Sequence, residues 1–157
     1  MLSPLLIIGV GGAGGKTIRA MKQELNRILE SSGHTGGIPE AWQFLQIDTT
    51  RGGIEFTAPM LPADEFHCVV PQGSNYGDIL SSITARGSLH EQQGMLAGWG
   101  IPAPAIWINS SPRQDRAIGR LAIMADAGKT LQAIQTSISK MKGPIALAEL
   151  ALSLIHI

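Results

Sequence analysis

The hydrophobic residues of the chain follow two kinds of pattern, short continuous runs and helical repeats. Leu5–Val10 is continuously apolar, which is typical of a strand buried on both faces of a parallel sheet. Residues 42–47 predict a second strand, which ends at Asp48. Between the two strands, from about residue 15 to 31, apolar residues recur every three or four positions. They predict the buried face of one helix: Ile18, Met21, Leu25, Ile28 and Leu29.

The pattern weakens after Asp48 and becomes regular again near residue 115. The middle of the chain contains three weaker predictions: a strand over 67–70, a helix over 76–89 and a strand end over 105–108. From 115 to about 142 the helical spacing returns. Lys140, Lys142 and Gly143 are typical of a helix end, and Pro144 is expected to interrupt the helical hydrogen bonds.

The order strand, glycine turn, helix, strand is that of a βαβ unit with a right-handed crossover. We therefore expect an α/β fold, a Rossmann-like three-layer sandwich whose sheet is mostly parallel and incomplete. Residues 1–157 are expected to form one partial domain. Because residues 144–157 are apolar and end without a polar finish, our hypothesis is that the chain is a fragment, truncated at its C-terminus.

The composition of the chain excludes several classes of function. The chain has 12 basic and 12 acidic residues and no net charge, which argues against a nucleic-acid partner and against binding to an anionic membrane. Its 44% hydrophobic content indicates a folded protein rather than a disordered one. A single cysteine, Cys68, excludes an internal disulfide and suits a reducing compartment. No signal peptide or membrane-spanning run is visible, so we expect a cytoplasmic protein without membrane insertion.

A glycine-rich motif joins the first predicted strand to the first helix. Gly9-Val10-Gly11-Gly12-Ala13-Gly14 satisfies G-x-G-x-x-G in the strand–turn–helix setting that the motif requires. Glycines let the backbone approach a ligand closely, and a helix N-terminus presents unpaired N–H groups to an anion. The motif therefore predicts a phosphate site, with Lys16 as a counter-charge. A tight turn that binds no ligand is the alternative.

Spacing distinguishes between the known kinds of phosphate loop. Neither Gly-Lys-Thr triplet, at 15–17 or 128–130, has the earlier glycine that a P-loop needs. A dinucleotide fold places an acidic residue at the end of the second strand, about 20 residues after the motif. Asp48 ends that strand but follows Gly14 by 34 positions. A Rossmann-type NAD- or FAD-dependent oxidoreductase domain therefore remains an alternative.

Three separated segments carry a family resemblance. Residues 8–15 look like the first phosphate loop of the tubulin/FtsZ family, in particular of its divergent bacterial tubulin-like branch. Residues 44–50, Phe-Leu-Gln-Ile-Asp-Thr-Thr, are similar to the second strand and following loop of that family. Residues 116–122 look like the helix after its third nucleotide loop. The family's GGGTGSG signature is absent, and Lys16 stands where the family usually has asparagine.

The resemblance implies a protein that binds GTP or GDP, with or without Mg²⁺, and that self-associates into polymers when full length. The implied nucleotide contacts are Gly11, Gly12, Ala13, Gly14, Gly15, Lys16, Asp48, Thr49 and Arg113. No catalytic residue is identified, because acidic residues of the next subunit activate water in the family. Residues 1–157 alone are therefore not expected to hydrolyse GTP appreciably. The four histidines are scattered, so no metal site is predicted.

Overall fold

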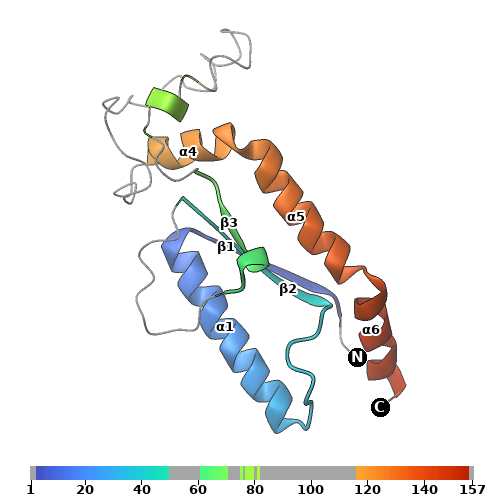
Figure 1. Cartoon of the computed structure of the whole chain (residues 1–157). Helices are drawn as coiled ribbons and strands as arrows, with labels where there is room; N and C mark the ends of the chain where they lie inside the picture. Colours follow the sequence, from blue (N-terminus) through green and yellow to red (C-terminus); the bar gives the residue numbers. More distant parts are fainter. Residues whose placement is uncertain are drawn as a thin grey trace. The chain divides into compact units, whose positions relative to one another are not determined.

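A computed structural model describes residues 3–49, 61–70, 75, 77–79, 81 and 116–155 (Figure 1). Contacts within the chain group it into two compact units. The first comprises Met1–Asp48, Ile54–His67 and Leu131–Ile157, and the second comprises Thr49–Gly53 and Cys68–Thr130. The single partial domain expected over residues 1–157 stays a prediction.

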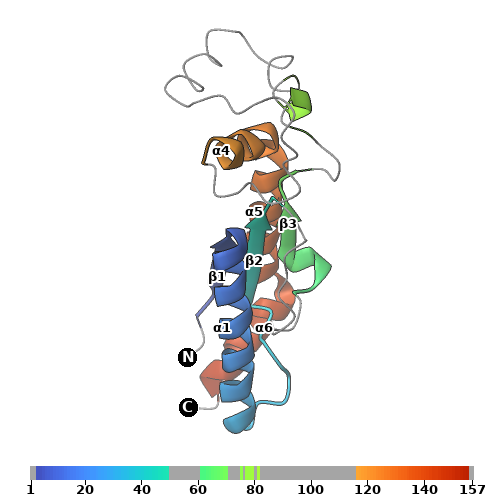
Figure 2. The same ribbon diagram turned by 90° about the vertical axis from the view of Figure 1, so that its left-hand side faces the viewer.

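The first unit is built on a parallel sheet with strand order β1-β2-β3. Strand β1 is Leu5–Val10, β2 is Trp42–Asp48 and β3 is Phe66–Cys68. β1 and β2 pair in parallel from Leu5 opposite Trp42 to Val10 opposite Ile47. Helix α1, Gly11–Ser31, provides the crossover between them. This βαβ arrangement, an open and incomplete parallel sheet with helices, confirms the predicted α/β class (Figures 1 and 2).

Helix α1 covers one face of β1 and β2 (Figure 2). Its buried face differs from the predicted one, because Met21 and Ile28 are 39% and 46% exposed. Ile18 is buried as predicted and Leu25 and Leu29 are partly buried. Gly15 and Arg19 are buried as well, and Lys22 places its Nζ 5.5 Å from the ring centre of Phe44. Long cationic side chains can cover a sheet with their aliphatic stems, which explains why the helix does not need a continuous apolar stripe.

Residues 131–155 lie along the other face of the sheet, so the first unit has three layers (Figures 1 and 2). Helix α6, Pro144–Ile155, is tied to the start of β2 by the Glu149 carboxylate, whose Oε2 accepts hydrogen bonds from the backbone N–H of Glu40 at 2.6 Å and of Ala41 at 3.4 Å. The buried apolar side chains of this unit are Ile18, Ala41, Phe44, Leu45, Ile47 and Ala146.

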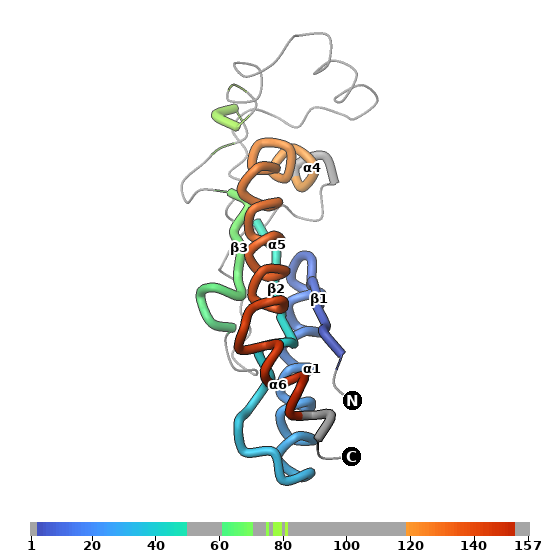
Figure 3. The backbone as a smooth tube through the Cα atoms, turned by 90° about the vertical axis from the view of Figure 1, so that its right-hand side faces the viewer, coloured from blue at the N-terminus to red at the C-terminus, as the bar shows by residue number. Residues whose placement is uncertain are grey.

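The predicted helix over 115–142 is present as two helices, α4 over Arg116–Ala125 and α5 over Ala127–Met141. Backbone hydrogen bonds from Asp126 N–H to Ala122 and from Thr130 N–H to Asp126 continue through the junction. The helical chain then resumes at Pro144 as α6 (Figure 3). The expectation that Pro144 stops the helix holds only for α5: at the first position of a new helix proline has no N–H to lose and its φ is already suitable.

The remaining predictions concern the middle of the chain. The strand expected over 67–70 is present as β3, which starts one residue earlier, at Phe66, and ends at Cys68. Residues 77–79 and 81 are helical, within the helix expected over 76–89. The strand end expected at 105–108 lies outside the described residues. Among the described residues, no helix is both long enough and apolar enough to cross a membrane.

Candidate functional site: the glycine bend

The candidate site lies at the carboxyl end of β1, where the strand turns into α1. We call residues Gly11–Gly15 the glycine bend. Gly11 is the first residue of α1 and has a φ of +68°, a conformation that favours glycine. No side chain caps this helix, and its first turn contains no acidic residue. The N–H groups of the first turn therefore lack the usual internal partner and carry the positive end of the helix dipole.

Close packing explains Gly9, near the end of β1, and Gly14 and Gly15 in the glycine bend. A Cβ on Gly9 would lie 2.5 Å from the carbonyl oxygen of Gly14, and one on Gly14 would lie 2.7 Å from the carbonyl carbon of Gly9. A Cβ on Gly15 would lie 2.2 Å from the side-chain nitrogen of Gln46. These contacts bring the first turn of α1 directly against β1 and β2.

Gly11 and Gly12 have different surroundings. Within the described part of the chain, a Cβ on either residue would meet no atom within 4 Å. Gly11 is explained by its positive φ, but Gly12 has neither a positive φ nor a close neighbour. The outer side of the bend is therefore open, and its glycine at position 12 leaves room for another molecule to approach the backbone.

The next residues of α1 are exposed. Lys16 is on the helix surface one residue after the bend, and Thr17 donates a hydrogen bond from Oγ1 to the carbonyl of Ala13 at 3.1 Å. The Thr17 hydroxyl is thus engaged with the helix itself. Lys16 remains near enough in sequence to serve the predicted counter-charge role.

Asp48 lies beside the glycine bend. Because Val10, the last residue of β1, pairs with Ile47, Asp48 ends β2 next to the point where β1 passes into the glycine bend. The Asp48 carboxylate is held on one oxygen, Oδ2, by a hydrogen bond from Gln46 Nε2 at 3.3 Å. The sheet therefore brings the predicted residues of the bend and Asp48 together.

Two further residues of this site were not predicted from the sequence. Gln46 and Arg19 are 4% and 6% exposed, and Arg19 donates from a terminal guanidinium nitrogen to Gln46 Oε1 at 2.9 Å. A signal for both was present. Gln46 is a polar residue inside an apolar strand, and Arg19 follows Ile18 on the buried side of the helix.

The other two predicted contacts are Thr49 and Arg113. Thr49 is 9% exposed and follows Asp48 in the sequence, but it belongs to the second unit, where its carbonyl accepts a hydrogen bond from the Cys68 thiol at 3.5 Å. Cys68 is half-buried, and its thiol also donates to the Val70 carbonyl at 3.0 Å. Arg113 lies outside the described residues.

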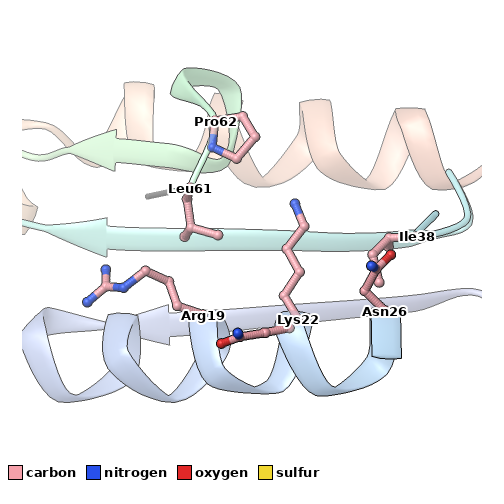
Figure 4. Close-up of a pocket in the computed structure, with 7 residues that line it drawn as sticks. Arg19, Lys22, Asn26, Ile38, Leu61 and Pro62 are labelled. Atoms are coloured by element: carbon pink, nitrogen blue, oxygen red, sulfur yellow. The ribbon is translucent and has the colours of Figure 1, made fainter. Parts of the chain in front are cut away.

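A separate cavity of about 270 Å³ opens beside α1 and is lined by residues that include Arg19, Lys22, Asn26, Ile38, Leu61 and Pro62 (Figure 4). Lys22 is already paired there, because its Nζ donates to both carboxylate oxygens of Glu65 at 2.5 and 2.6 Å. Figure 4 shows Arg19 extending along α1 toward the carboxyl ends of the strands. Its charged group thus points to the side of the sheet where the glycine bend lies.

The described residues contain no group of three or more histidine, cysteine, aspartate or glutamate side chains arranged to hold a metal ion. Mg²⁺ is commonly bound by one or two carboxylates together with the phosphates of a substrate.

Comparison with known proteins places the chain in a family. A family model described as "Tubulin like" matches residues 6–153, which include β1, the glycine bend and Asp48. No curated protein and no solved structure matches the chain. The family match confirms the tubulin-like part of the resemblance read from the sequence, on a fold of the expected class. The chain belongs to the tubulin-like protein family.

Proposed function

We propose that this chain binds a guanine nucleotide, GTP or GDP, with the polyphosphate on the N–H groups of the glycine bend. The observation that carries the proposal is the open, uncapped first turn of α1. Packing and φ explain the other glycines, whereas Gly12 is explained by a ligand that approaches its backbone. Membership of the tubulin-like family supports guanine as the base.

Asp48 indicates the form in which the nucleotide binds. A carboxylate beside a polyphosphate is repelled unless a cation lies between them. We therefore propose that Mg²⁺ accompanies the nucleotide, held by its phosphates and by Asp48. When bound, Mg²⁺ would neutralise phosphate charge at this edge of the sheet. Lys16, on the surface next to the bend, and Arg113 are the proposed counter-charges for the remaining phosphate oxygens.

Other parts of the proposal rest on the family alone. On the basis of the tubulin-like assignment, we propose self-association of the protein, polymer formation and a cytoplasmic location. Thr49 is kept as a proposed neighbour of the nucleotide on the same basis. We assign no catalytic residue and propose no hydrolytic step for residues 1–157.

A matched pair of glycine variants tests the phosphate site. Gly12 and Gly128 are each the second residue of a helix, and a Cβ on either meets no described atom within 4 Å. Replacing either with alanine is expected to raise helix stability by up to about 1 kcal/mol. Gly12→Ala alone places a methyl group where the phosphates would lie. We expect it to weaken binding of labelled GTP about tenfold or more, an effect of about 1.4 kcal/mol, whereas Gly128→Ala binds as the unchanged protein does.

The same equilibrium binding measurement, repeated with ATP and NAD, separates the alternatives. The second candidate function is a dinucleotide-dependent oxidoreductase domain, which is favoured by the position of Asp48 at the end of β2 beside the bend. Preferential binding of NAD would favour that candidate. Equal GTP affinity for the two glycine variants would contradict the proposed phosphate position.

A further inference from the structure

Gln46 is the side chain that connects three parts of the site. Its amide oxygen accepts a hydrogen bond from Arg19 at 2.9 Å, and its amide nitrogen donates to Asp48 Oδ2 at 3.3 Å. The same amide lies against the backbone of Gly15, where an added Cβ would come within 2.2 to 2.4 Å of it. A single buried amide therefore touches helix α1, the glycine bend and the carboxylate at the end of β2.

The direction of these hydrogen bonds is fixed by chemistry. A guanidinium group has only donors, so the Gln46 oxygen must face Arg19. The NH₂ group of the amide then has to face Asp48, whose ionised carboxylate has only acceptors. Arg19 thus determines which way the Gln46 amide is turned, and Gln46 in turn determines where the Asp48 carboxylate is held.

We propose that Arg19 and Gln46 form a buried relay that positions the Asp48 carboxylate for Mg²⁺ and the nucleotide phosphates at the glycine bend. The proposal rests on the proposed function and deepens it. Arg19 and Gln46 are positioning residues, because they act through Asp48 and the bend rather than by touching the ligand.

The burial of Arg19 supports a role beyond packing. Among the described residues Arg19 forms no ion pair with a carboxylate, and its Nε, which is buried, has no hydrogen-bond partner. Burying a charge without an ionised partner costs free energy, and a buried donor without an acceptor calls for an explanation. Charges inside a protein are screened less than those at its surface. The guanidinium therefore favours negative charge at the carboxyl ends of the strands, where Asp48 lies.

The substitution Gln46→Glu separates the two halves of the relay. The carboxylate that it introduces keeps the side-chain size and still accepts from Arg19, so the buried guanidinium gains an ionised partner. It cannot donate to Asp48, and the two carboxylates repel each other. We therefore expect the variant to keep the contact with Arg19 that supports the fold and to lose the hydrogen bond to Asp48.

A second glutamine of β2 provides the matched control. Gln43 is 8% exposed, lies at the opposite end of the strand from the glycine bend, and donates from Nε2 to the carbonyl of Glu40 at 2.8 Å. Gln43→Glu therefore makes the same chemical change at a similarly buried position of the same strand, away from Asp48.

The readout is the ratio of GTP affinities measured with Mg²⁺ and with a chelator, together with thermal unfolding of each variant. Loss of a residue that supports a metal ligand typically weakens metal binding by about 10- to 100-fold. We expect Gln46→Glu to lower the Mg²⁺-dependent gain in GTP affinity by about tenfold or more, and Gln43→Glu to leave it unchanged. A Gln46→Glu protein that is folded and keeps the full gain would overturn the relay while leaving the proposed function intact.

The double variant Gln46→Glu with Asp48→Asn removes the repulsion and restores one hydrogen bond in the reverse direction, because the new amide donates to the new carboxylate. We expect it to regain thermal stability but not the Mg²⁺-dependent gain, since no carboxylate remains at position 48. Recovery of that gain would show that only the hydrogen bond matters and would overturn the positioning role. An unchanged protein that binds no GTP in either condition would overturn both this proposal and the proposed function.

Discussion

Gly9 and Gly14 are in direct backbone contact across the turn from β1 to α1. A Cβ on Gly9 would come within 2.5 Å of the Gly14 carbonyl oxygen, and a Cβ on Gly14 would come within 2.7 Å of the Gly9 carbonyl carbon. Real side chains do not make contacts of this length. The first and last glycines of the G-x-G-x-x-G motif are therefore needed to seat the helix on the strand, whether or not a ligand is bound.

This contact predicts that Gly14→Ala destabilises the fold. The added methyl group meets backbone atoms, which cannot move aside as a flexible side chain can, and overpacking of this kind costs about 1 to 3 kcal/mol. Urea unfolding of Gly14→Ala and Gly12→Ala measures the difference, since the second substitution adds the same group in open space. Equal stabilities for the two variants would show that the strand–helix contact relaxes easily.

The strands and the glycine bend could be predicted because their signals are local. Leu5–Val10 is a run of apolar residues next to a glycine motif, and the strand boundaries agree with the structure. Helix α1 begins at Gly11, earlier than the predicted start near residue 15, because the glycines of the motif form its first turn. The buried face of α1 could not be predicted from apolar spacing alone. Arg19 and Lys22 cover the sheet through their aliphatic stems and their polar partners, and a hydrophobicity pattern does not contain those pairings.

The candidate site shows the same division. The glycine bend is contiguous in the sequence and could be predicted from it. Asp48 could be predicted because it ends the second strand. The relay depends on three residues from two elements, Arg19, Gln46 and Asp48. Their proximity results from the parallel register of β1 and β2 and from the way α1 lies on them, and neither is written in the local sequence.

A second prediction concerns pH and the ion pair between Asp64 and Lys140, whose Nζ and Oδ2 are 2.5 Å apart. The hydrogen bond from Lys140 lowers the pKa of Asp64 below its ordinary value of 3.8. The carboxylate therefore stabilises the fold above that value, and the contribution is lost as the pH falls through the lowered pKa of the folded state. Because the Asp64 side chain is 62% exposed, the effect is about 1 kcal/mol or less.

Unfolding experiments at neutral pH and at an acid pH below the lowered pKa of folded Asp64 check this pair. We expect Asp64→Asn to be less stable than the unchanged protein at neutral pH and to show no difference from it in acid. Lys140→Met removes the cationic partner of Asp64 and should reduce the loss of stability in acid to the same extent. A stability difference that persists undiminished in acid would contradict an electrostatic origin.

A third prediction concerns the Glu149 carboxylate, which accepts from the backbone N–H groups of Glu40 and Ala41 just before β2. Glu149→Ala leaves both donors without this acceptor in a part-buried position, and we expect a loss of about 1 to 3 kcal/mol. Glu149→Gln retains a carbonyl oxygen and should recover most of that loss. Urea unfolding measures both variants, and equal losses for the two would indicate that the charge of Glu149 matters rather than its hydrogen bonds.

The last prediction tests the energetic coupling of Arg19 and Gln46 by a double-mutant cycle. Gln46→Leu leaves a buried guanidinium without its hydrogen-bond acceptor, so we expect a loss of about 3 kcal/mol or more. Arg19→Met removes the charge, keeps an unbranched apolar side chain and leaves only a neutral amide oxygen unpaired, for which about 1 to 3 kcal/mol is expected. With both partners replaced the uncompensated groups disappear together, so the double variant should be more stable than Gln46→Leu alone. Additive losses would mean that the 2.9 Å hydrogen bond between Arg19 and Gln46 contributes no coupling to the folded state.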